Sequence, residues 1–332
     1  MFRKKVVVGL DLGSYSLQWA AIEPRSNACY VWRKRLLSER SSKHDRLDHQ
    51  SLQGRLRALL ATAERETPVW NPSVVAGIQG QSVICGYLEF PELTKKELEV
   101  AVLSGVTREI PFPIETMEVS HLPVAALKEG KTGVFYSTWR RADAQRLHSL
   151  LGGCDIKIKR LEATGVALTR ELFRNRKLDA EAFYLIIHVG FELTQFIAVR
   201  GGYPYYLRDI PVGGQDVTYA IQVGAQTSWQ DAEELKHRYP IEELVFAAGP
   251  LFREWSYELK RSLKYFQRRY HVPEVAEVFL SGGSALLQGL PEWLSGELGL
   301  PVQLDGWSLL NSRQSDEEAP CHKIAVGLAL GQ

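Results

Sequence analysis

The sequence predicts a duplicated α/β fold with two similar lobes, and two observations lead to this prediction. A unit of three apolar strands near residues 6–36 returns near residues 183–210, each time with a glycine-containing turn after its first strand. Between and after these units, strand patterns alternate with helical patterns. A unit that recurs in this way is typical of a duplicated architecture.

Each repeated unit has the order strand, tight turn, strand. This is a hairpin, and it differs from the strand-to-helix step of Rossmann and Walker nucleotide sites. We expect the strands of the first unit at Val6–Leu10, Leu17–Ile22 and Tyr30–Leu36. Those of the second unit are expected at Phe183–Val189, Leu193–Val199 and Tyr203–Ile210.

The remaining elements follow from apolar periodicity and from helix end signals. Thr94 and Glu97 have the spacing of a capping box, and the helix that they begin must end before Pro111. Further helices are expected at Leu52–Glu66, Ala142–Leu151, Ala163–Phe173, Val217–Val223, Trp229–Lys236, Leu251–Tyr270 and Leu290–Leu298. Further strands are expected at Val74–Ile78, Val83–Phe90, Met117–Leu122, Gly133–Ser137, Ile156–Leu161 and Val275–Leu280. Polar loops are expected at Ser38–His49 and Arg313–Glu318.

Composition restricts the class of protein. The 332 residues are 45% apolar and 24% charged, which suits a soluble globular protein with a sizeable core. A formal charge of +1 gives no support for a role in gripping nucleic acid. The four cysteines lie far apart, so no zinc or redox motif is predicted, and scattered cysteines of this kind are mostly buried small apolar groups or idle surface thiols. We expect no export signal and no membrane-spanning helix.

The first turn contains Asp11, Gly13, Ser14 and Tyr15. Its amides and hydroxyls suit phosphate oxygens, and Asp11 suits hydrated Mg²⁺. Asp-x-Gly is also common in ordinary β-turns. In the second turn, Gly190 takes the place of Gly13, whereas His188 stands where the repeat predicts an aspartate. We interpret His188 as a hydrogen-bonded histidine at a strand end.

Three later segments have both a functional and a structural interpretation. Gly213 and Gly214 precede a helix, where backbone amides either receive phosphate or simply start the helix. Glu233 and Lys236 share one helix face, as a ligand contact or as a surface ion pair. Gly282 and Gly283 leave room for a flat ring, or form a plain turn.

The basic helix at residues 259–271 suggests a nucleic-acid surface, but we favour an amphipathic helix. In that interpretation Leu259, Leu263, Phe266 and Tyr270 point inward and the basic side is solvated.

The order of these motifs resembles the actin/heat-shock-ATPase superfamily, with its duplicated actin-like, ribonuclease H-like fold and nucleotide cleft between two lobes. Within it, the chain is similar to the PilM family of type IV pilus assembly and its relatives in secretion and DNA uptake. The segments that carry this resemblance are Val8–Ser14, Glu109–Pro113, Ala232–Lys236, Glu258–Leu263, Leu280–Gly283 and Ala325–Leu330.

The resemblance implies a division of the chain. The first core subdomain takes residues 1–85 and 154–180, and an inserted small α+β subdomain, placed as in the division protein FtsA, takes residues 86–153. The second lobe takes residues 181–332, with its C-terminal segment packed back on the core.

The resemblance also implies a function. A PilM-like protein is cytoplasmic and is recruited to the inner face of the inner membrane. There it binds the N-terminal tail of the membrane protein PilN, in a groove between the first core subdomain and the inserted one, and connects it to the motor ATPases. Direct nucleic-acid binding and membrane insertion are not expected.

ATP and Mg²⁺ are implied as cofactors. Asp11, Gly13, Ser14 and Tyr15 would face the phosphates, with Gly190, Gly213 and Gly214 on the second phosphate side. Glu233 and Lys236 would contact the ribose, and Gly282 and Gly283 would pack against adenine.

Two departures from the superfamily pattern concern catalysis. His188 replaces an aspartate, and Gln18 stands where many relatives have lysine. We therefore expect no catalytic residue set and no more than very weak ATPase activity. The alternatives are an active ATPase or small-molecule kinase of the same superfamily, and a filament-forming protein like FtsA.

Overall fold

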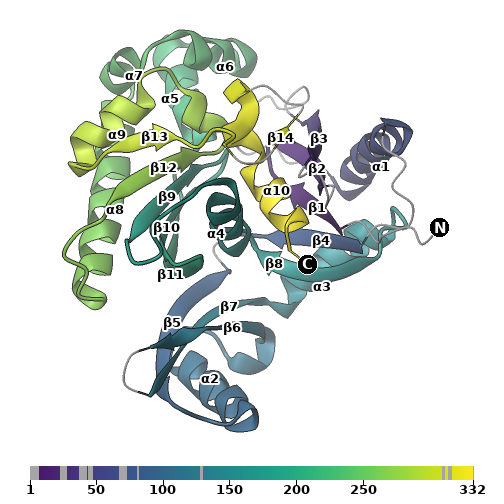
Figure 1. Cartoon of the computed structure of the whole chain (residues 1–332). Helices are drawn as coiled ribbons and strands as arrows, with labels where there is room; N and C mark the ends of the chain where they lie inside the picture. Colours follow the sequence, from purple (N-terminus) through teal and green to yellow (C-terminus); the bar gives the residue numbers. More distant parts are fainter. Residues whose placement is uncertain are drawn as a thin grey trace.

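The structure is a computed structural model that describes residues 7–22, 28–36, 43, 48–66, 73–80, 82–127, 130–308, 311–312 and 316–331. In this part of the chain the strands form three sheets, of six, five and three strands. Figure 1 shows the two larger sheets side by side in the upper body and the smallest sheet below them.

The six-stranded sheet of the first lobe has the order β14-β3-β2-β1-β4-β8. Its strands are β1 (Val7–Leu12), β2 (Ser16–Ile22), β3 (Ala28–Arg35), β4 (Ser73–Ile78), β8 (Ile158–Ala163) and β14 (Asn311–Ser312). The first three strands form an antiparallel meander, and β4 and β8 continue the sheet in parallel. The predicted hairpin unit is therefore confirmed; Val6 lies outside the described residues.

The five-stranded sheet of the second lobe has the order β11-β10-β9-β12-β13. Its strands are β9 (Tyr184–Val189), β10 (Thr194–Arg200), β11 (Tyr203–Ile210), β12 (Glu277–Ser281) and β13 (Val302–Leu304). It repeats the first sheet: an antiparallel meander of three strands, followed by two parallel strands. This topology confirms the predicted duplication.

Two helices fill the space between the larger sheets, α4 (Thr164–Asn175) and α10 (Lys323–Ala329) (Figure 1). Helix α10 packs on β1, β2 and α4. The approach to β1 requires glycine at position 9, because a Cβ atom there would lie 1.9 Å from the carbonyl oxygen of Ala325.

The outer helices account for most of the other segments with helical apolar periodicity. They are α1 (His49–Glu66), α3 (Arg141–Gly152), α5 (Gly214–Ala225), α6 (Trp229–Arg238), α7 (Ile241–Ala247), α8 (Gly249–Arg269) and α9 (Leu290–Leu298). On α8, Leu259, Leu263 and Phe266 are buried and Tyr270, just after it, packs against them, which confirms the amphipathic interpretation of this basic helix.

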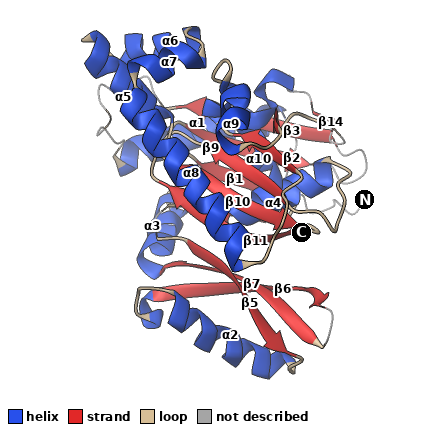
Figure 2. Ribbon diagram, turned by 90° about the vertical axis from the view of Figure 1, so that its left-hand side faces the viewer, coloured by secondary structure: helices blue, strands red, loops and turns tan. Residues whose placement is uncertain are grey.

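The smallest sheet has the order β5-β7-β6, with β5 (Ile84–Pro91), β6 (Met117–Leu127) and β7 (Lys131–Arg140). Helix α2 (Lys95–Glu109) packs against β5 and β7, and Figure 2 shows it along the outer face of this sheet. The capping box is present: Thr94 Oγ1 accepts from the Glu97 amide, and Glu97 Oε2 accepts from the Thr94 amide. A 3₁₀ turn, Ile114–Thr116, follows the proline stretch that ends α2.

Three features differ from the expectations. Helix α7 and the short strands β13 and β14 are additional elements. Residues Asp316–His322 form a 3₁₀ helix, η4, so the predicted polar loop ends earlier than expected. Most of the predicted loop at 38–49 lies outside the described residues, and α1 begins at His49.

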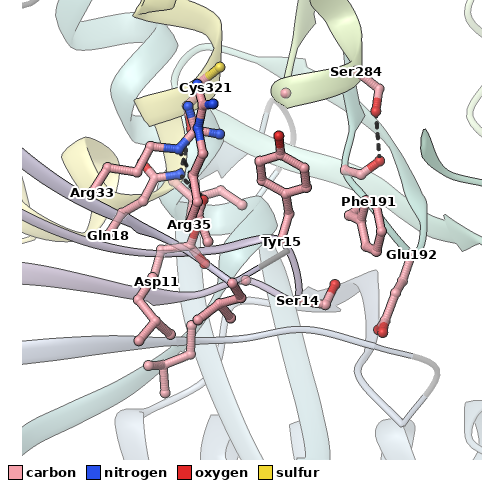
Figure 3. A pocket seen from close by; sticks show the side chains of 18 of the residues that line it. Asp11, Ser14, Tyr15, Gln18, Arg33, Arg35, Phe191, Glu192, Ser284 and Cys321 are labelled. Atoms are coloured by element: carbon pink, nitrogen blue, oxygen red, sulfur yellow. Dashed lines mark hydrogen bonds between the residues drawn. The ribbon is translucent and has the colours of Figure 1, made fainter. Parts of the chain in front are cut away.

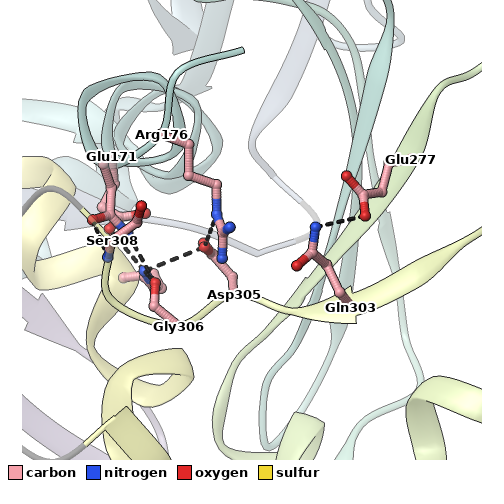
Figure 4. A network of polar contacts seen from close by, with 9 residues as sticks. Glu171, Arg176, Glu277, Gln303, Asp305, Gly306 and Ser308 are labelled. Atoms are coloured by element: carbon pink, nitrogen blue, oxygen red, sulfur yellow. Dashed lines mark hydrogen bonds and ion pairs between the residues drawn. The ribbon is translucent and has the colours of Figure 1, made fainter.

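A buried polar network fixes α10 against both lobes (Figure 4). Lys323 Nζ contacts the Glu171 carboxylate at 2.8 Å and the Asp305 carboxylate at 3.3 Å, and all three side chains are almost fully buried. Arg176 Nε adds an ion pair to Asp305 at 3.1 Å. Two cations thus face two acidic side chains, and burial raises the pKa of Glu171 although the charge of Lys323 opposes this change.

Candidate functional site

A cavity of about 690 Å³ lies between the two lobes. Its walls come from the β1–β2 turn, the β9–β10 turn, α6, η4 and the 3₁₀ turn η3 (Gly283–Leu286). Figure 3 shows side chains from both lobes facing this space, including Tyr15 from the first lobe and Phe191 from the second. Its size is in the range of small-molecule sites.

The structure brings most of the predicted site residues to this cavity. Those in its wall are Asp11, Gly13, Ser14, Tyr15, Gly190, Glu233, Lys236 and Gly283. The other three, Gly213, Gly214 and Gly282, are not part of the wall and pack behind it. The assigned roles of all eleven in ligand binding stay predictions.

Asp11 is a buried carboxyl group in the first turn. Burial raises its pKa to about 7, although the positive charge of Arg33 acts in the opposite direction. Within the described part of the chain, its side chain has no hydrogen-bond partner. Gly13 keeps the turn tight, because a Cβ atom there would lie 2.9 Å from the carbonyl oxygen of Ser16.

Two contacts join the lobes beside the cavity. The rings of Tyr15 and Phe191, one from each hairpin turn, have centroids 5.4 Å apart. Lys43 Nζ lies 2.5 Å from the Asp216 carboxylate on α5 and faces the Tyr219 ring. Aromatic and ionic contacts therefore connect the first lobe to the second.

The second turn uses its polar groups internally. The amides of Gly214 and Gln215 donate to the carbonyl oxygens of Gly190 and Phe191, at 3.0 and 2.8 Å. The Gly213 amide donates to Asp216 Oδ2 at 2.8 Å. The amides at the start of α5, predicted to face a phosphate, are thus already paired within the second lobe.

His188 occupies the position where the repeat predicts an aspartate. Its Nδ1 lies 3.0 Å from Ser281 Oγ on β12, and burial lowers its pKa to about 4. A neutral imidazole of this kind does not replace a carboxylate near a metal ion. The interpretation of His188 as a hydrogen-bonded histidine at a strand end is confirmed.

Glu233 and Lys236 form an ion pair that is buried, not on the surface. Lys236 Nζ lies 2.7 Å from Glu233 Oε2, 3.0 Å from Thr218 Oγ1 and 3.3 Å from the Gly214 carbonyl oxygen. Burial alone would raise the pKa of Glu233, but contacts from His237, Lys236 and Thr218 lower it to about 2. Burial lowers the pKa of Lys236, but the Glu233 carboxylate opposes that change, so we describe the pair as ionised at neutral pH.

The late glycine pair packs against the second turn. Gly282 has φ of 96°, and a Cβ atom there would lie 2.3 Å from the carbonyl oxygen of Val189. The next residues bring Ser284 Oγ to 3.3 Å from the Gly190 carbonyl oxygen, a contact drawn in Figure 3. Only glycine fits at position 282, because of its positive φ and its contact with the backbone of Val189. This requirement does not depend on a ligand.

The groups in the wall fit a nucleotide on the first-lobe side. Asp11 offers a buried carboxyl group without a hydrogen-bond donor, and a bound cation would favour its ionised form. Asp11 would hold hydrated Mg²⁺, and Gly13 and Ser14 would bind phosphate oxygens; the ion would supply charge neutralisation there. The second lobe offers Gly190 but no matching acid at position 188.

Two arginines in the cavity wall, Arg33 and Arg35 on β3, were missed by sequence reasoning. The available signal was strand alternation, since residues 33 and 35 lie on one face of a predicted strand. The sequence identified Gln18 only as a residue that differs from the lysine of many relatives, and its contacts were not predicted. Its amide bonds the carbonyl oxygen of Cys321 at 2.9 Å and Nδ1 of His322 at 2.8 Å.

Among the described residues there is no cluster of three or more histidine, cysteine or acidic side chains suited to a metal ion. Within the same residues no helix combines the length and apolar character that crossing a membrane requires. The cysteines Cys29, Cys85, Cys154 and Cys321 are free and buried, as predicted.

Solved structures with the same fold extend over almost the entire chain. A structure titled PilM-PilN type IV pilus biogenesis complex matches with a TM-score of 0.82 and 24% identity, covering 98% of this chain and 97% of that chain. The ethanolamine utilization protein EutJ from Carboxydothermus hydrogenoformans matches at 0.58 and 15% identity, covering 100% and 91%. MreB 5 of Spiroplasma citri, bound to AMPPNP, matches at 0.56 and 10% identity, covering 98% and 95%.

These likenesses confirm the actin-like fold that the motifs predict. At sequence level, the family described as type IV pilus assembly protein PilM matches residues 9–332. That range includes both lobes and the small three-stranded sheet. The chain therefore belongs to the PilM family of type IV pilus assembly proteins.

Proposed function

We propose that this protein is an adaptor of type IV pilus assembly that binds the N-terminal cytoplasmic tail of a PilN-like inner-membrane protein. The observation that carries the proposal is the family match, which runs through the small subdomain as well as both lobes. A related chain of the same fold was solved as a PilM-PilN complex. The protein would act in the cytoplasm, at the inner face of the inner membrane, and would connect that partner to the motor ATPases.

The proposed tail site is the groove between the first core subdomain and the small one. Strand β7 leads directly into α3, which contacts β7 on one side and β8 and α1 of the first core subdomain on the other, so α3 lies at this junction. Strand β6 is an edge of the small sheet, and it exposes Leu122. An exposed edge strand with an apolar side chain suits an extended peptide.

We infer that ATP with Mg²⁺ binds in the cleft, on the first-lobe side described above. Because His188 is neutral and buried, a second acid for the metal is missing from that position. Hydrolysis is therefore expected to be very weak, and the nucleotide would stabilise the closed lobes instead of driving chemistry.

The test is calorimetric titration with the N-terminal peptide of the PilN-like protein from the same organism, with a scrambled peptide as control. We expect saturable binding, with amide hydrogen exchange slowed in residues 117–152. The variant Leu122→Asp should weaken binding, whereas Val223→Asp, on the exposed side of α5, should not. Binding that leaves residues 117–152 unprotected would contradict the proposed groove.

A steady-state ATPase assay separates this proposal from the enzyme alternative. Working enzymes turn over at about 1 per second or faster. Turnover at that rate would overturn the adaptor proposal in its non-catalytic form. Turnover far below it, together with peptide binding, is the expected result.

A further inference from the structure

The strands at the first turn carry a cation, Arg33, in line with Asp11 across the sheet. Asp11, Gln18 and Arg33 are direct cross-strand neighbours on β1, β2 and β3. Directly paired residues in a sheet point to the same face. The three side chains therefore form one row that ends at the cleft.

Gln18 is not available to a ligand. Its side chain is 4% exposed, and both ends of its amide are hydrogen-bonded to η4, through the Cys321 carbonyl oxygen and His322 Nδ1. Position 18 thus connects β2 to η4. A positive charge for the first turn has to come from a neighbouring strand.

Arg33 supplies that charge. Its Nε donates to Ser16 Oγ at 3.1 Å, and its guanidinium lies 5.5 Å from the centroid of the Tyr15 ring. Both contacts hold it beside the turn that carries Asp11. The other end reaches the second lobe, because Nη2 lies 3.9 Å from where a Cβ atom of Gly283 would be.

Arg35 lies on the same face of β3, two residues further along, and also lines the cavity. Figure 3 shows Arg33 and Arg35 together, next to Gln18 and Cys321. Within the described part of the chain, no carboxylate lies within ion-pair distance of either arginine. Two cations without carboxylate partners at the edge of a ligand-sized cavity indicate an anionic ligand.

We propose that Arg33, supported by Arg35, binds the phosphate groups of the nucleotide and replaces the cation that Gln18 cannot provide. This inference rests on the nucleotide part of the proposed function. It assigns the phosphates to the first-lobe side of the cleft, beside Asp11 and the two arginines. The second-lobe amides at the start of α5 are already paired and contribute little.

The experiment is calorimetric titration of the full chain with ATP-Mg²⁺, ADP-Mg²⁺ and adenosine. The variants are Arg33→Gln, the charge-preserving Arg33→Lys, and Lys34→Gln as the matched control. Lys34 is the next residue on the same strand, is exposed, and is not part of the cavity wall. Its replacement removes the same charge from the opposite face.

We expect Arg33→Gln to weaken ATP binding about 10-fold to 100-fold, since a hydrogen bond to a charged group is lost. Adenosine affinity should stay within about 2-fold, Arg33→Lys should retain part of the ATP affinity, and Lys34→Gln should behave as wild type. Equal losses for ATP and adenosine would overturn the proposal, because they would assign Arg33 to the base or to structure alone. Unchanged ATP binding in Arg33→Gln would overturn it as well.

A wild-type protein that binds none of the three ligands would overturn this inference and the nucleotide part of the proposed function together. The tail-binding part is tested separately with the PilN-like peptide. Arg33→Gln is expected to bind that peptide with wild-type affinity, because Arg33 is far in sequence and fold from the small sheet.

Discussion

The two hairpin turns of this protein occupy equivalent places in the duplicated fold, but their polar groups are used differently. In the first turn, the Asp11 carboxyl group is buried without a hydrogen-bond donor from the described residues. In the second turn, the carbonyl oxygens of Gly190 and Phe191 accept from the start of α5. The histidine at the position of Asp11 is paired with Ser281.

The two turns therefore differ in whether their polar groups are satisfied within the protein. The first turn keeps groups suited to a ligand at a cost in stability. The second keeps the backbone shape of a phosphate turn and satisfies its own polar groups. Predictions on stability can therefore tell the turns apart without any ligand.

The largest effect is expected for Asp11→Asn. The pKa of Asp11 is raised from 3.8 to about 7, so the folded state binds the proton more strongly and stability falls as pH rises through this window. At pH 8 without metal or nucleotide, the variant should be more stable by up to about 4 kcal/mol, and below pH 4 the gain should vanish. Urea unfolding across pH measures this. The control Asp155→Asn, at an exposed position, should change stability by less than about 0.5 kcal/mol.

His188→Gln should change the pH dependence with the opposite sign. The pKa of His188 is lowered from 6.5 to about 4, so the unfolded state binds the proton more strongly and wild-type stability falls as pH drops through this window. The variant should lose up to about 3 kcal/mol of that pH-dependent change. A wild-type slope between pH 4 and 6.5 in the variant would show that His188 does not titrate as a buried neutral group.

Gly213→Ala tests how tightly the second turn is packed. A Cβ atom at this position would lie 2.4 Å from the Phe191 carbonyl oxygen, so backbone atoms must move. We expect a loss of about 2 kcal/mol in the free energy of unfolding. Gly224→Ala, near the end of α5 with open space around it, should instead gain up to about 1 kcal/mol. Equal effects of the two substitutions would contradict the tight packing.

The smallest effect is expected for Ser284→Ala, which removes the 3.3 Å hydrogen bond from Oγ to the Gly190 carbonyl oxygen. The loss should be about 1 kcal/mol, and it is measured by thermal unfolding. A neutral result would mean that the backbone hydrogen bonds of the second turn hold it without the Ser284 hydroxyl.

Much of the fold could be predicted because its signals are local. The repeated strands, the Thr94–Glu97 capping box and the apolar stripe of α8 each depend on residues close together in sequence. The order of the motifs along the chain also predicted the fold, because it resembles that of a known superfamily. Elements without a local pattern, such as the two-residue strand β14, were not predicted.

The candidate site was harder to predict, because its decisive contacts connect distant residues. Whether the amides of Gly214 and Gln215 are open depends on the carbonyl oxygens of Gly190 and Phe191. The burial of Lys236 depends on Thr218 and Gly214 from another helix. The three-residue spacing on α6 correctly placed Glu233 beside Lys236. It did not indicate that this ion pair is buried.

The contact between Gly9 and Ala325 has a consequence for how the protein is made. During synthesis, β1 to β3 leave the ribosome early, but the helix that covers Ala20, Val31 and their neighbours contains Ala325, Val326 and Ala329. Until those residues emerge, this apolar face of the first lobe has no cover from α10. Pairing elements so distant in sequence slows folding and leaves apolar surface open to aggregation. We therefore expect the nascent chain to depend on chaperones until α10 has been synthesised.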